Sequence, residues 1–381
     1  MTIGILKEPA YETRVSLLAE AVATLTKKNI IVFVESGAGV DAYCSNSDYE
    51  NAGAVIKNRI EILNLSDIIL SINHPEQSDP DSYRDTNLRS LPAGQAGKIA
   101  IGVYHPLFNI DMMKHWAAAN VTSFSLDMLP RTTRAQAMDV LSSQANIAGY
   151  KAVLTAANMY PRYFPMFMTA AGSIKPARIL ILGAGVAGLQ AIATARRLGA
   201  VVEVFDTRPA VKEEVISLGA KFIEVDGAAD ASSAGGYAVE QSEEFMQRQK
   251  AKIAESIAKA DIVITTAQIP GKKAPILITE EMIKAMRSGS VIIDIASATG
   301  GNTPLTKNNE TVIYNGVSIV GNSNLPATMP ADASKVYGKN VLNFLQLIIT
   351  KDGQLNLNWE DDLVKGSCIT HNGEIVHERI K

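Results

Sequence analysis

Three glycines, Gly183, Gly185 and Gly188, have the spacing G-x-G-x-x-G and stand between an apolar run and a helix-like segment. The first glycine allows a tight turn out of a strand, and the second lets backbone N–H groups approach a ligand without a Cβ in the way. The third lets the helix pack closely on the strand. Because unpaired N–H groups and the dipole at a helix N-terminus favour an anion, this stretch predicts a site for a dinucleotide pyrophosphate.

Asp206 ends the β-branched run 201–205, roughly 20 residues beyond the glycines. A carboxylate at this point accepts hydrogen bonds from the adenosine ribose and repels the 2′-phosphate of NADP. Arg208 would favour that phosphate, but its side chain can swing into solvent, so we give more weight to Asp206. The sequence therefore favours NAD(H) over NADP(H).

Two other interpretations of residues 177–206 stay open. One is a packed βαβ unit without a ligand. The other is a membrane-spanning helix, since residues 179–195 carry no charge. The glycines, Gln190 and the basic pair Arg196 and Arg197 disfavour a membrane span.

A second group of polar residues lies between the two halves of the chain, where we expect a long helix from just after Pro130 to about Asn158. Spacings of three and four would place its polar residues on one face. These residues are Gln136, Asp139, Ser143, Asn146 and Tyr150, with Ser142 beside them. A stripe without Lys or Glu indicates a half-buried surface near a ligand, or equally a polar seam between domains.

The segment 226–241 combines small residues, the pair Gly235 and Gly236, and one tyrosine, Tyr237. Such a composition buries too little apolar surface to stay rigid. It is typical of a mobile lid beside a cofactor site, or of a plain exposed insertion. Composition alone slightly favours the insertion.

Apolar runs alternate with helical patterns along the chain, which predicts an α/β protein with parallel sheets. The expected strands are 3–6, 30–35, 67–72, 99–104, 121–125, 179–182, 201–205, 221–225, 262–265, 291–295 and 318–320. The expected helices include 17–28, 48–51, 110–120, 189–198 and 332–349. We expect two Rossmann-like domains joined by long helices. The first domain would be discontinuous, with residues 1–135 and 330–381, and the second would hold residues 136–329.

Composition narrows the class of protein further. A chain of 381 residues with 47% hydrophobic and 20% charged residues is typical of a two-domain soluble enzyme. The net charge of −3 gives no electrostatic argument for nucleic-acid binding. Two cysteines outside any C-x-x-C indicate a reducing compartment, and the five histidines have no metal-ligand spacing. The start of the chain leaves no room for a signal peptide, so we expect none.

Several longer stretches together carry a family resemblance. They are MLPRTTRAQAMDVLSSQANIAGYKAV (128–153), MTAAGSIKPARILILGAGVAGLQAIATARRLGA (168–200), AGGYAVE (234–240), TTAQIPGKKAPILIT (265–279) and GSVIIDIASATGGN (289–302). Over nearly its whole length the chain resembles the NAD(H)-binding component of proton-translocating NAD(P) transhydrogenase (domain I, the first portion of the alpha subunit). It is more distantly similar to alanine dehydrogenase.

This resemblance implies roles for particular residues. The nicotinamide end of NAD(H) would be held by Arg131, Gln136, Asp139 and Ser142, which with Tyr237 form the expected catalytic set. The same site would be lined by Thr132, Thr133, Ala137 and Met138. The remaining expected contacts to the cofactor are Gly183, Gly185, Val186, Gly188, Asp206, Thr207, Arg208, Gly236, Gln249 and Gln268. Gln268 departs from the family, in which leucine is frequent at this position.

The alanine dehydrogenase alternative needs a cationic carboxylate binder and an acid/base pair. The arginine of that family is retained as Arg14, but the substrate lysine would fall at Asn73 and an active-site aspartate at Ala298. The catalytic histidine has no clear counterpart, because His105 is displaced from its position. Hydride transfer between two nicotinamides needs none of these groups, since the protein must only place two rings face to face and exclude water.

The resemblance also implies partners and a location. Hydride would pass from NADH to NADP(H) on a membrane-embedded partner subunit, coupled to proton translocation, in an enzyme of the Si-specific, AB-specific type. The chain ends without an apolar stretch of 18 residues, so we expect a separate soluble subunit, dimeric and peripheral on the cytoplasmic face of the cell membrane. A third possibility is a non-catalytic NAD(H)-binding module.

Overall fold

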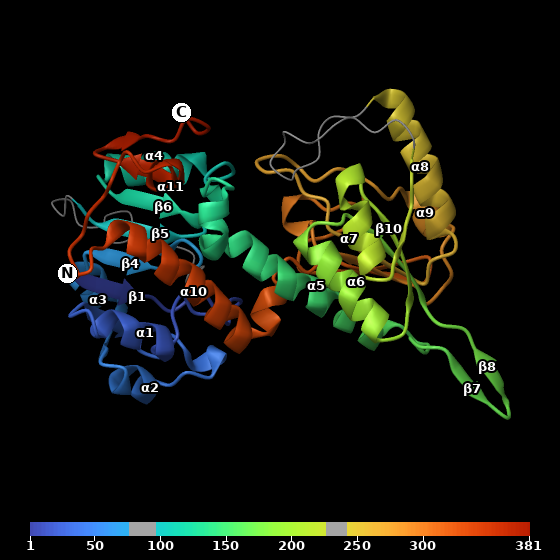
Figure 1. The fold of residues 1–381 in the computed structure, drawn as a ribbon, viewed down its shortest axis with the longest axis horizontal. Coiled ribbons are helices and arrows are strands. Elements are labelled where there is room, and N and C mark those ends of the chain that lie inside the picture. The colour runs from blue at the N-terminus through green and yellow to red at the C-terminus, as the bar shows by residue number, and fades with distance from the viewer. Residues whose placement is uncertain (76–96, 226–241) are drawn as a thin grey trace. The chain divides into compact units, whose positions relative to one another are not determined.

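A computed structural model describes residues 1–75, 97–225 and 242–381 of the chain (Figure 1). The described residues form two compact units. Unit 1 contains Met1–Gln144 and Ala327–Lys381, and unit 2 contains Ala145–Pro326. Each unit is a sheet covered by helices on both faces, and the two are described separately below.

The sheet of unit 1 has eight strands in the order β17-β16-β6-β5-β4-β1-β2-β3. The strands are β1 (Thr2–Ile5), β2 (Ile31–Glu35), β3 (Val55–Lys57), β4 (Ile68–Leu70), β5 (Ile99–Gly102), β6 (Thr122–Ser125), β16 (Cys368–His371) and β17 (Glu374–Ile375). Read from the β3 end, the first six strands have the order 3-2-1-4-5-6, and all of them are parallel. Strand β16 pairs antiparallel with β6, and β17 pairs antiparallel with β16 at the edge of the sheet. This strand order is that of a doubly wound Rossmann sheet, whose direction of winding reverses between β1 and β4.

The helices of unit 1 cover its sheet on both faces. They are α1 (Ala19–Thr26), α2 (Asn46–Asn51), α3 (Arg59–Leu65), α4 (Ile110–Ala118), α10 (Pro330–Ile348) and α11 (Asp362–Ser367), with short 3₁₀ turns at Val40–Ala42, Leu126–Met128 and Thr133–Met138. Alternate strand residues point to opposite faces, so Ile3 and Ile5 pack with α1 and α10 while Ile69 packs against α3. Ser45 and Asn58 form capping boxes that start α2 and α3.

The sheet of unit 2 has seven strands in the order β11-β10-β9-β12-β13-β15-β14. The strands are β9 (Arg178–Leu182), β10 (Val201–Phe205), β11 (Lys221–Phe222), β12 (Ile262–Thr265), β13 (Val291–Asp294), β14 (Thr311–Tyr314) and β15 (Val317–Val320). All neighbours are parallel except β14 and β15. The order is again 3-2-1-4-5-6 for β9 to β13 and β15, with the reversal between β9 and β12.

Two helical layers cover this second sheet (Figure 1). The helices are α6 (Val186–Arg197), α7 (Lys212–Ser217), α8 (Glu243–Ile257) and α9 (Glu280–Lys284), together with the later part of α5 (Val140–Met159), and 3₁₀ turns occur at Pro209–Val211, Ser297–Thr299 and Leu325–Thr328. Ile179 and Ile181 pack against α5, α6 and α7, whereas Leu180 and Leu182 pack against α8 and α9. The near-continuous apolar character of β9 is what burial on both faces requires.

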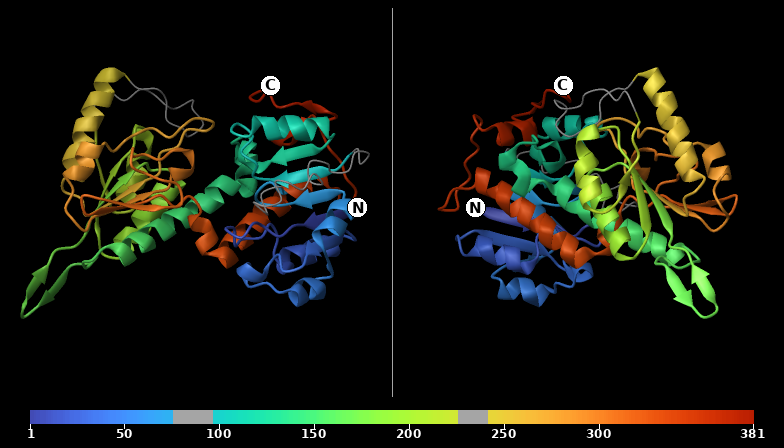
Figure 2. Two further views of the ribbon diagram at one scale, coloured as in Figure 1. Left: turned by 180° about the vertical axis from the view of Figure 1, so that it is seen from behind. Right: turned by 45° about the vertical axis from the view of Figure 1, so that its right-hand side comes forward.

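A two-stranded hairpin, β7 (Phe167–Thr169) and β8 (Gly172–Ile174), leaves the body of unit 2 between α5 and β9. Figure 2 shows it projecting from that unit in both views. All six strand residues are exposed. An isolated two-stranded ribbon is marginally stable in water at best, so this feature calls for a partner surface.

The predicted fold class is confirmed: both sheets are mostly parallel and have Rossmann-like order. The sequence patterns did not predict strands β3 and β14, the hairpin, the C-terminal strands β16 and β17, or helices α3, α7, α8, α9 and α11. Among the helices of the described residues, none is long and apolar enough to span a membrane.

Candidate nucleotide site

The glycine turn joins β9 to α6, and each of its three glycines has its own steric reason. Gly183 has φ of +107°, and a Cβ there would lie 2.3 Å from Thr266 Oγ1. A Cβ on Gly188 would lie 1.9 Å from the carbonyl oxygen of Gly183, so only glycine lets α6 approach the turn this closely. Among the described residues, a Cβ on Gly185 would meet no atom within 4 Å. The space beside Gly185 is therefore open, as a ligand that touches the backbone requires.

This turn fits a pyrophosphate. Gly185 is the N-cap residue of α6 and makes no side-chain capping hydrogen bond, so the first N–H groups of a twelve-residue helix start at an open surface. The turn lies at the carboxyl end of β9, next to the reversal between β9 and β12, where doubly wound sheets bind their ligands. Val186 follows at the surface, 39% exposed.

Asp206, directly after β10, has both carboxylate oxygens engaged. Oδ2 accepts from Ala184 N at 2.7 Å and from Arg208 Nη2 at 2.8 Å. Oδ1 accepts from Arg208 N at 2.8 Å and from Arg208 Nε at 2.9 Å. The Arg208 side chain, which could have pointed into solvent, is instead paired with Asp206 and only 18% exposed. Its guanidinium forms a two-pronged ion pair with Asp206, because that planar fork matches a carboxylate two residues away.

Other residues at the same sheet edge hold the turn in place. Thr266 donates from Oγ1 to the carbonyl oxygens of Leu182 and Gly183, each at 3.3 Å. Gln268 is exposed and its Nε2 donates to the carbonyl oxygen of Ile295 at 3.3 Å. Thr266 was missed in the sequence, although its position directly after β12 is the signal that could have found it.

Asp294 is a further missed residue, fully buried at the end of β13. Its oxygens accept from the backbone of Ala296 at 3.0 Å, from the backbone of Asn302 at 2.6 Å and from Thr306 Oγ1 at 2.6 Å. Asn302 in turn donates to the carbonyl oxygen of Ala267 at 2.9 Å. Asp294 therefore folds the loop after β13 back onto the loop that carries Gln268.

Of the remaining expected contacts in unit 2, Thr207 is partly buried after β10 and Gln249 is partly buried on α8. Gly236 and Tyr237 lie outside the described residues, as does the whole segment expected to form a lid. No group of three or more His, Cys, Asp or Glu side chains with a metal-binding arrangement occurs within residues 1–75, 97–225 and 242–381.

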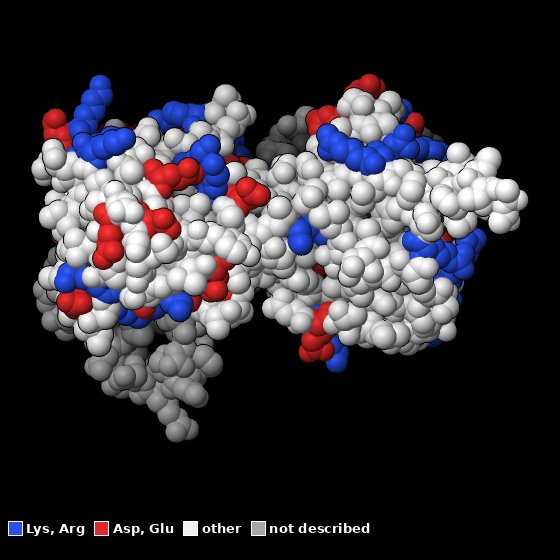
Figure 3. Space-filling view, turned by 90° about the horizontal axis from the view of Figure 1, so that it is seen from below, with Lys and Arg blue, Asp and Glu red and all other residues white. Residues whose placement is uncertain are grey.

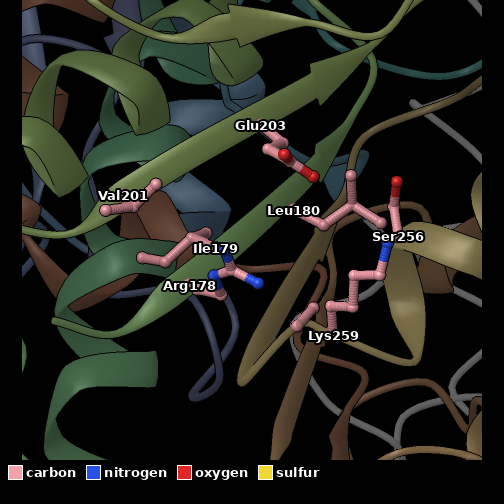
Figure 4. Close-up of a pocket in the computed structure, with 8 residues that line it drawn as sticks. Arg178, Ile179, Leu180, Val201, Glu203, Ser256 and Lys259 are labelled. Atoms are coloured by element: carbon pink, nitrogen blue, oxygen red, sulfur yellow. The ribbon is translucent and has the colours of Figure 1, made fainter. Parts of the chain in front are cut away.

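A shallow hollow in unit 2 lies away from the glycine turn (Figure 4). Its lining includes Arg178, Val201, Glu203, Ser256 and Lys259. Arg178 and Val201 are the first residues of β9 and β10, so the hollow is at the amino end of the strands. Ligands of doubly wound sheets bind at the opposite, carboxyl end, and we assign no function to this hollow.

In unit 1 the expected nicotinamide residues begin in a 3₁₀ turn, Thr133–Met138, and not in a long helix. Asp139 follows with extended backbone, and α5 begins only at Val140. Asp139 accepts from Ser142 N at 2.9 Å and from Ser142 Oγ at 2.6 Å, which is N-capping geometry. The expectation of one helical stripe is therefore wrong for Gln136 and Asp139, because the cap at Asp139 sets the start of the helix.

Most of these residues are at the surface of unit 1. The exposed ones are Arg131, Thr132, Thr133, Gln136 and Ala137. Met138 is different, because its side chain is in the hydrophobic core and is only 7% exposed. Only the backbone of Met138 is left to contact a ligand.

The 3₁₀ turn is held against the rest of unit 1 by polar contacts. Arg134 donates to both carboxylate oxygens of Asp361, at 2.7 and 2.6 Å, and also contacts Asp362. Asn340 and Asn343 on α10 each donate to the carbonyl oxygen of Ala137 at 2.9 Å. These contacts fix the backbone of the 3₁₀ turn, while the side chain of Gln136 on this turn stays exposed.

The residues that an alanine dehydrogenase would need are engaged within unit 1. Arg14 is buried and pairs with Glu12, with Nη2 2.6 Å from Oε2 and Nε 2.7 Å from Oε1. Arg14 Nη1 also donates to Gln144 Oε1 at 2.8 Å. A substrate carboxylate would have to compete with Glu12 for the guanidinium.

Asn73 donates to Glu8, whose carboxylate is 6% exposed. Glu8 accepts from Ile72 N at 2.5 Å, from Asn73 N at 3.0 Å and from Asn73 Nδ2 at 3.1 Å. Burial raises the pKa of Glu8 to about 7, although these hydrogen bonds act in the opposite direction. His105 lies 3.5 Å from Asp127, and Ala298 offers no acid or base.

Comparison with known proteins decides the family. Residues 4–148 match the family description "Alanine dehydrogenase/PNT, N-terminal domain", and residues 152–378 match "Alanine dehydrogenase/PNT, C-terminal domain". The chain belongs to the alanine dehydrogenase/PNT family. Within this family it is 44% identical to the first portion of the NAD(P) transhydrogenase alpha subunit of Rhodospirillum rubrum, over 99% of this chain and 98% of the relative.

A solved transhydrogenase structure from Sinorhizobium meliloti is similar over 99% of this chain and 100% of that one, with 42% identity and a TM-score of 0.86. An alanine dehydrogenase from Staphylococcus saprophyticus is only 26% identical, over 100% of this chain and 96% of that one. The family and the transhydrogenase relatives confirm the resemblance found in the sequence. They place the chain among oxidoreductases that use nicotinamide nucleotides.

Proposed function

We propose that this chain is the NAD(H)-binding subunit of a proton-translocating transhydrogenase of the AB-specific type. The observation that carries the proposal is the glycine turn, with open space at Gly185 and Asp206 directly beside it. Similarity along the full chain to proteins named as transhydrogenase subunits supports the same assignment. The proposal places NADP(H) on a partner subunit.

The residues of this chain would bind and orient the nucleotide. The helix N-terminus at Gly185 would hold the pyrophosphate, and Asp206 the adenosine ribose. Arg131 and Gln136 would anchor the nicotinamide end from the surface of unit 1, where Asp139 and Ser142 fix the start of α5. A bound dihydronicotinamide supplies the hydride. No proton transfer to the protein accompanies that step, in keeping with Arg14 and Glu12 being bound to each other.

The proposed partners are a second copy of this chain and membrane-embedded subunits that supply the NADP(H) site. This places the chain on the cytoplasmic face of the membrane. Support for a homodimer comes from the hairpin, where Met168 is 72% exposed, and from Met166 directly before it, which is 65% exposed. Figure 3 shows the projecting hairpin end without Lys, Arg, Asp or Glu colour. Exposed apolar surface of this kind marks an interface.

The homodimer is testable with one charge on the hairpin. Met168→Lys would place an ammonium group in the proposed interface, and we expect sedimentation velocity to show a shift from dimer to monomer. The matched control is Ile313→Lys, which charges an equally apolar side chain, 74% exposed, on strand β14. A Met168→Lys variant that sediments as wild type does would contradict this interface.

The function is tested by combining the purified chain with membranes that contain its partner subunits. We expect NADH-dependent reduction of an NADP analogue, and binding of NADH to the isolated chain in preference to NADPH. Pyruvate- and ammonia-dependent oxidation of NADH by the chain alone would instead indicate an amino-acid dehydrogenase. NADH binding without any hydride transfer in the complete complex would indicate a non-catalytic module.

A further inference from the structure

The carboxylate of Asp206 has no spare acceptor positions in this structure. An ionised carboxylate offers about four lone-pair positions. Four N–H donors occupy them: Ala184 N and Arg208 Nη2 on Oδ2, and Arg208 N and Arg208 Nε on Oδ1. The Asp206 side chain is only 6% exposed, so water has little access to it. A ribose hydroxyl can donate to Asp206 only after one of these donors leaves.

The guanidinium is the donor group that can leave. Ala184 N belongs to the glycine turn, whose backbone is fixed by the close approach of Gly188 to Gly183. Arg208 N is fixed by its place two residues after Asp206. The Arg208 side chain, by contrast, is long, lies on a partly exposed loop and can rotate about its own bonds. Glu214 on α7 acts on the same guanidinium as a second, more distant carboxylate.

We infer that Arg208 is an internal competitor for the ribose site: its guanidinium occupies the Asp206 carboxylate in this structure and must move aside when the ribose binds. This inference rests on the proposed function, because it concerns the nucleotide site of unit 2. Such a competitor lowers the affinity for NAD(H) and speeds its release, which suits a site that exchanges reduced for oxidised nucleotide at each turnover. The positive charge of the displaced Arg208 guanidinium also weakens the electrostatic repulsion between Asp206 and the 2′-phosphate of NADP(H).

The test is the affinity of the purified chain for three ligands, NADH, NADPH and 2′-deoxy-NADH, measured by nucleotide fluorescence and calorimetry. Arg208→Ala removes the competitor, so we expect NADH to bind about fivefold tighter, the equivalent of about 1 kcal/mol. We expect NADPH to bind no tighter, because the uncompensated Asp206 now faces the 2′-phosphate. The increase in affinity caused by Arg208→Ala should be smaller for 2′-deoxy-NADH, because this ligand lacks a ribose hydroxyl that would donate to Asp206.

Two further variants complete the design. Arg197→Ala removes the same charge at the other end of α6, about 18 Å along the helix, and is expected to leave all three affinities unchanged. Arg208→Lys keeps the charge but loses the two-pronged fork, so its NADH affinity should lie between wild type and Arg208→Ala. Thermal melting of each variant shows that unit 2 is folded.

Weaker NADH binding by Arg208→Ala would overturn the inference, since it would make Arg208 a direct contact of the bound nucleotide. An equal gain for NADH and 2′-deoxy-NADH would overturn it as well, because the contested hydrogen bond would then not involve the ribose hydroxyl. Failure of the proposed function looks different. In that case the wild-type chain itself would bind NADH no better than NADPH, whatever the variants do.

Discussion

Glu8 is a carboxyl group buried between the ends of β1 and β4 in unit 1, and its replacement by glutamine gives a quantitative test of the structure. The carboxylate bridges the strand ends by accepting from Ile72 N, Asn73 N and Asn73 Nδ2. Glu12, Arg14, Tyr104 and Tyr337 are the other titratable groups whose charges couple to this cluster. Glu8→Gln keeps the size of the side chain but cannot ionise. Its amide nitrogen cannot accept the hydrogen bonds that one carboxylate oxygen accepts now, and this loss is the same at every pH, so the test reads the dependence on pH and not the absolute stability.

The expected effect follows from the pKa. Burial raises the pKa of Glu8 from 4.5 to about 7, so the folded state holds the proton more tightly than the unfolded state does. The stability that protonated Glu8 contributes is therefore fully present below pH 4.5. It decreases as the pH rises from 4.5 to about 7, and it does not change further above that pH. At 1.36 kcal/mol per pKa unit, the ionisation of Glu8 alone removes about 2 to 3 kcal/mol from the free energy of unfolding between about pH 5 and about pH 8.

The assay can report on unit 1 alone. The chain has two tryptophans, Trp116 and Trp359, and both belong to unit 1. Urea unfolding followed by tryptophan fluorescence at several pH values therefore gives the free energy of unfolding of this unit. Wild type should lose stability relative to Glu8→Gln as the pH rises. We expect the free energy of unfolding of Glu8→Gln, minus that of wild type, to increase by about 2 to 3 kcal/mol from about pH 5 to about pH 8.

The control is Glu20→Gln, which removes a carboxylate from an exposed position on α1 of the same unit. It corrects for the loss of one negative charge without the loss of a buried group. The reasoning would be refuted if Glu8→Gln showed the same dependence on pH as wild type, since Glu8 would then titrate alike in the folded and unfolded chain. If the stability of Glu8→Gln minus that of wild type increased toward low pH, the predicted direction of the pH dependence would be wrong.

Three other predictions concern the proposed nucleotide site. Gly188→Ala places a methyl group against a backbone oxygen and should weaken NADH binding at least about tenfold and lower the melting temperature. Gly185→Ala should weaken binding but leave melting unchanged, because φ of −78° suits alanine and no atom of residues 1–75, 97–225 or 242–381 lies within 4 Å of the new Cβ. Equal losses of melting temperature in both variants would contradict this difference. Arg131→Ala and Gln136→Asn should slow hydride transfer in the assembled complex more than they weaken NADH binding. Parallel losses of rate and affinity would show that these two residues only anchor the nucleotide.

The sequence predicted the parts of the fold where local pattern and tertiary environment agree. The strands β9, β10 and β12 are apolar, β-branched and buried on both faces, so their patterns and their positions in the sheet coincide. The glycine turn was predictable because each glycine meets a local steric demand within the same βαβ unit. Asp206 was predicted by its position after β10, and Thr266 could have been predicted in the same way after β12.

What could not be predicted depended on contacts far apart in the sequence or on competition between local signals. A single helix from Pro130 onward was plausible by periodicity, but the side chain of Asp139 satisfies the N–H of Ser142 and starts the helix anew. The burial of Met138 depends on the core of unit 1, to which α10 contributes from residues about 200 positions later. The pairing of Arg208 with Asp206 was not predicted because a fork-shaped ion pair depends on side-chain geometry, which spacing does not give.

The two units have sheets of the same strand order, and the described residues at their reversal points are the reason why we propose the nucleotide site in unit 2. In unit 2 the strand β9 leads into glycines, and the space beside Gly185 is open to the N-terminus of α6. In unit 1 the strand β1 leads into Glu8, whose own carboxylate takes the backbone N–H groups of Ile72 and Asn73 at the end of β4. An anionic ligand at the reversal in unit 1 would meet a side chain that already occupies those donors. The same strand order therefore leaves an open helix N-terminus for a nucleotide in unit 2, whereas in unit 1 the Glu8 carboxylate links the ends of β1 and β4.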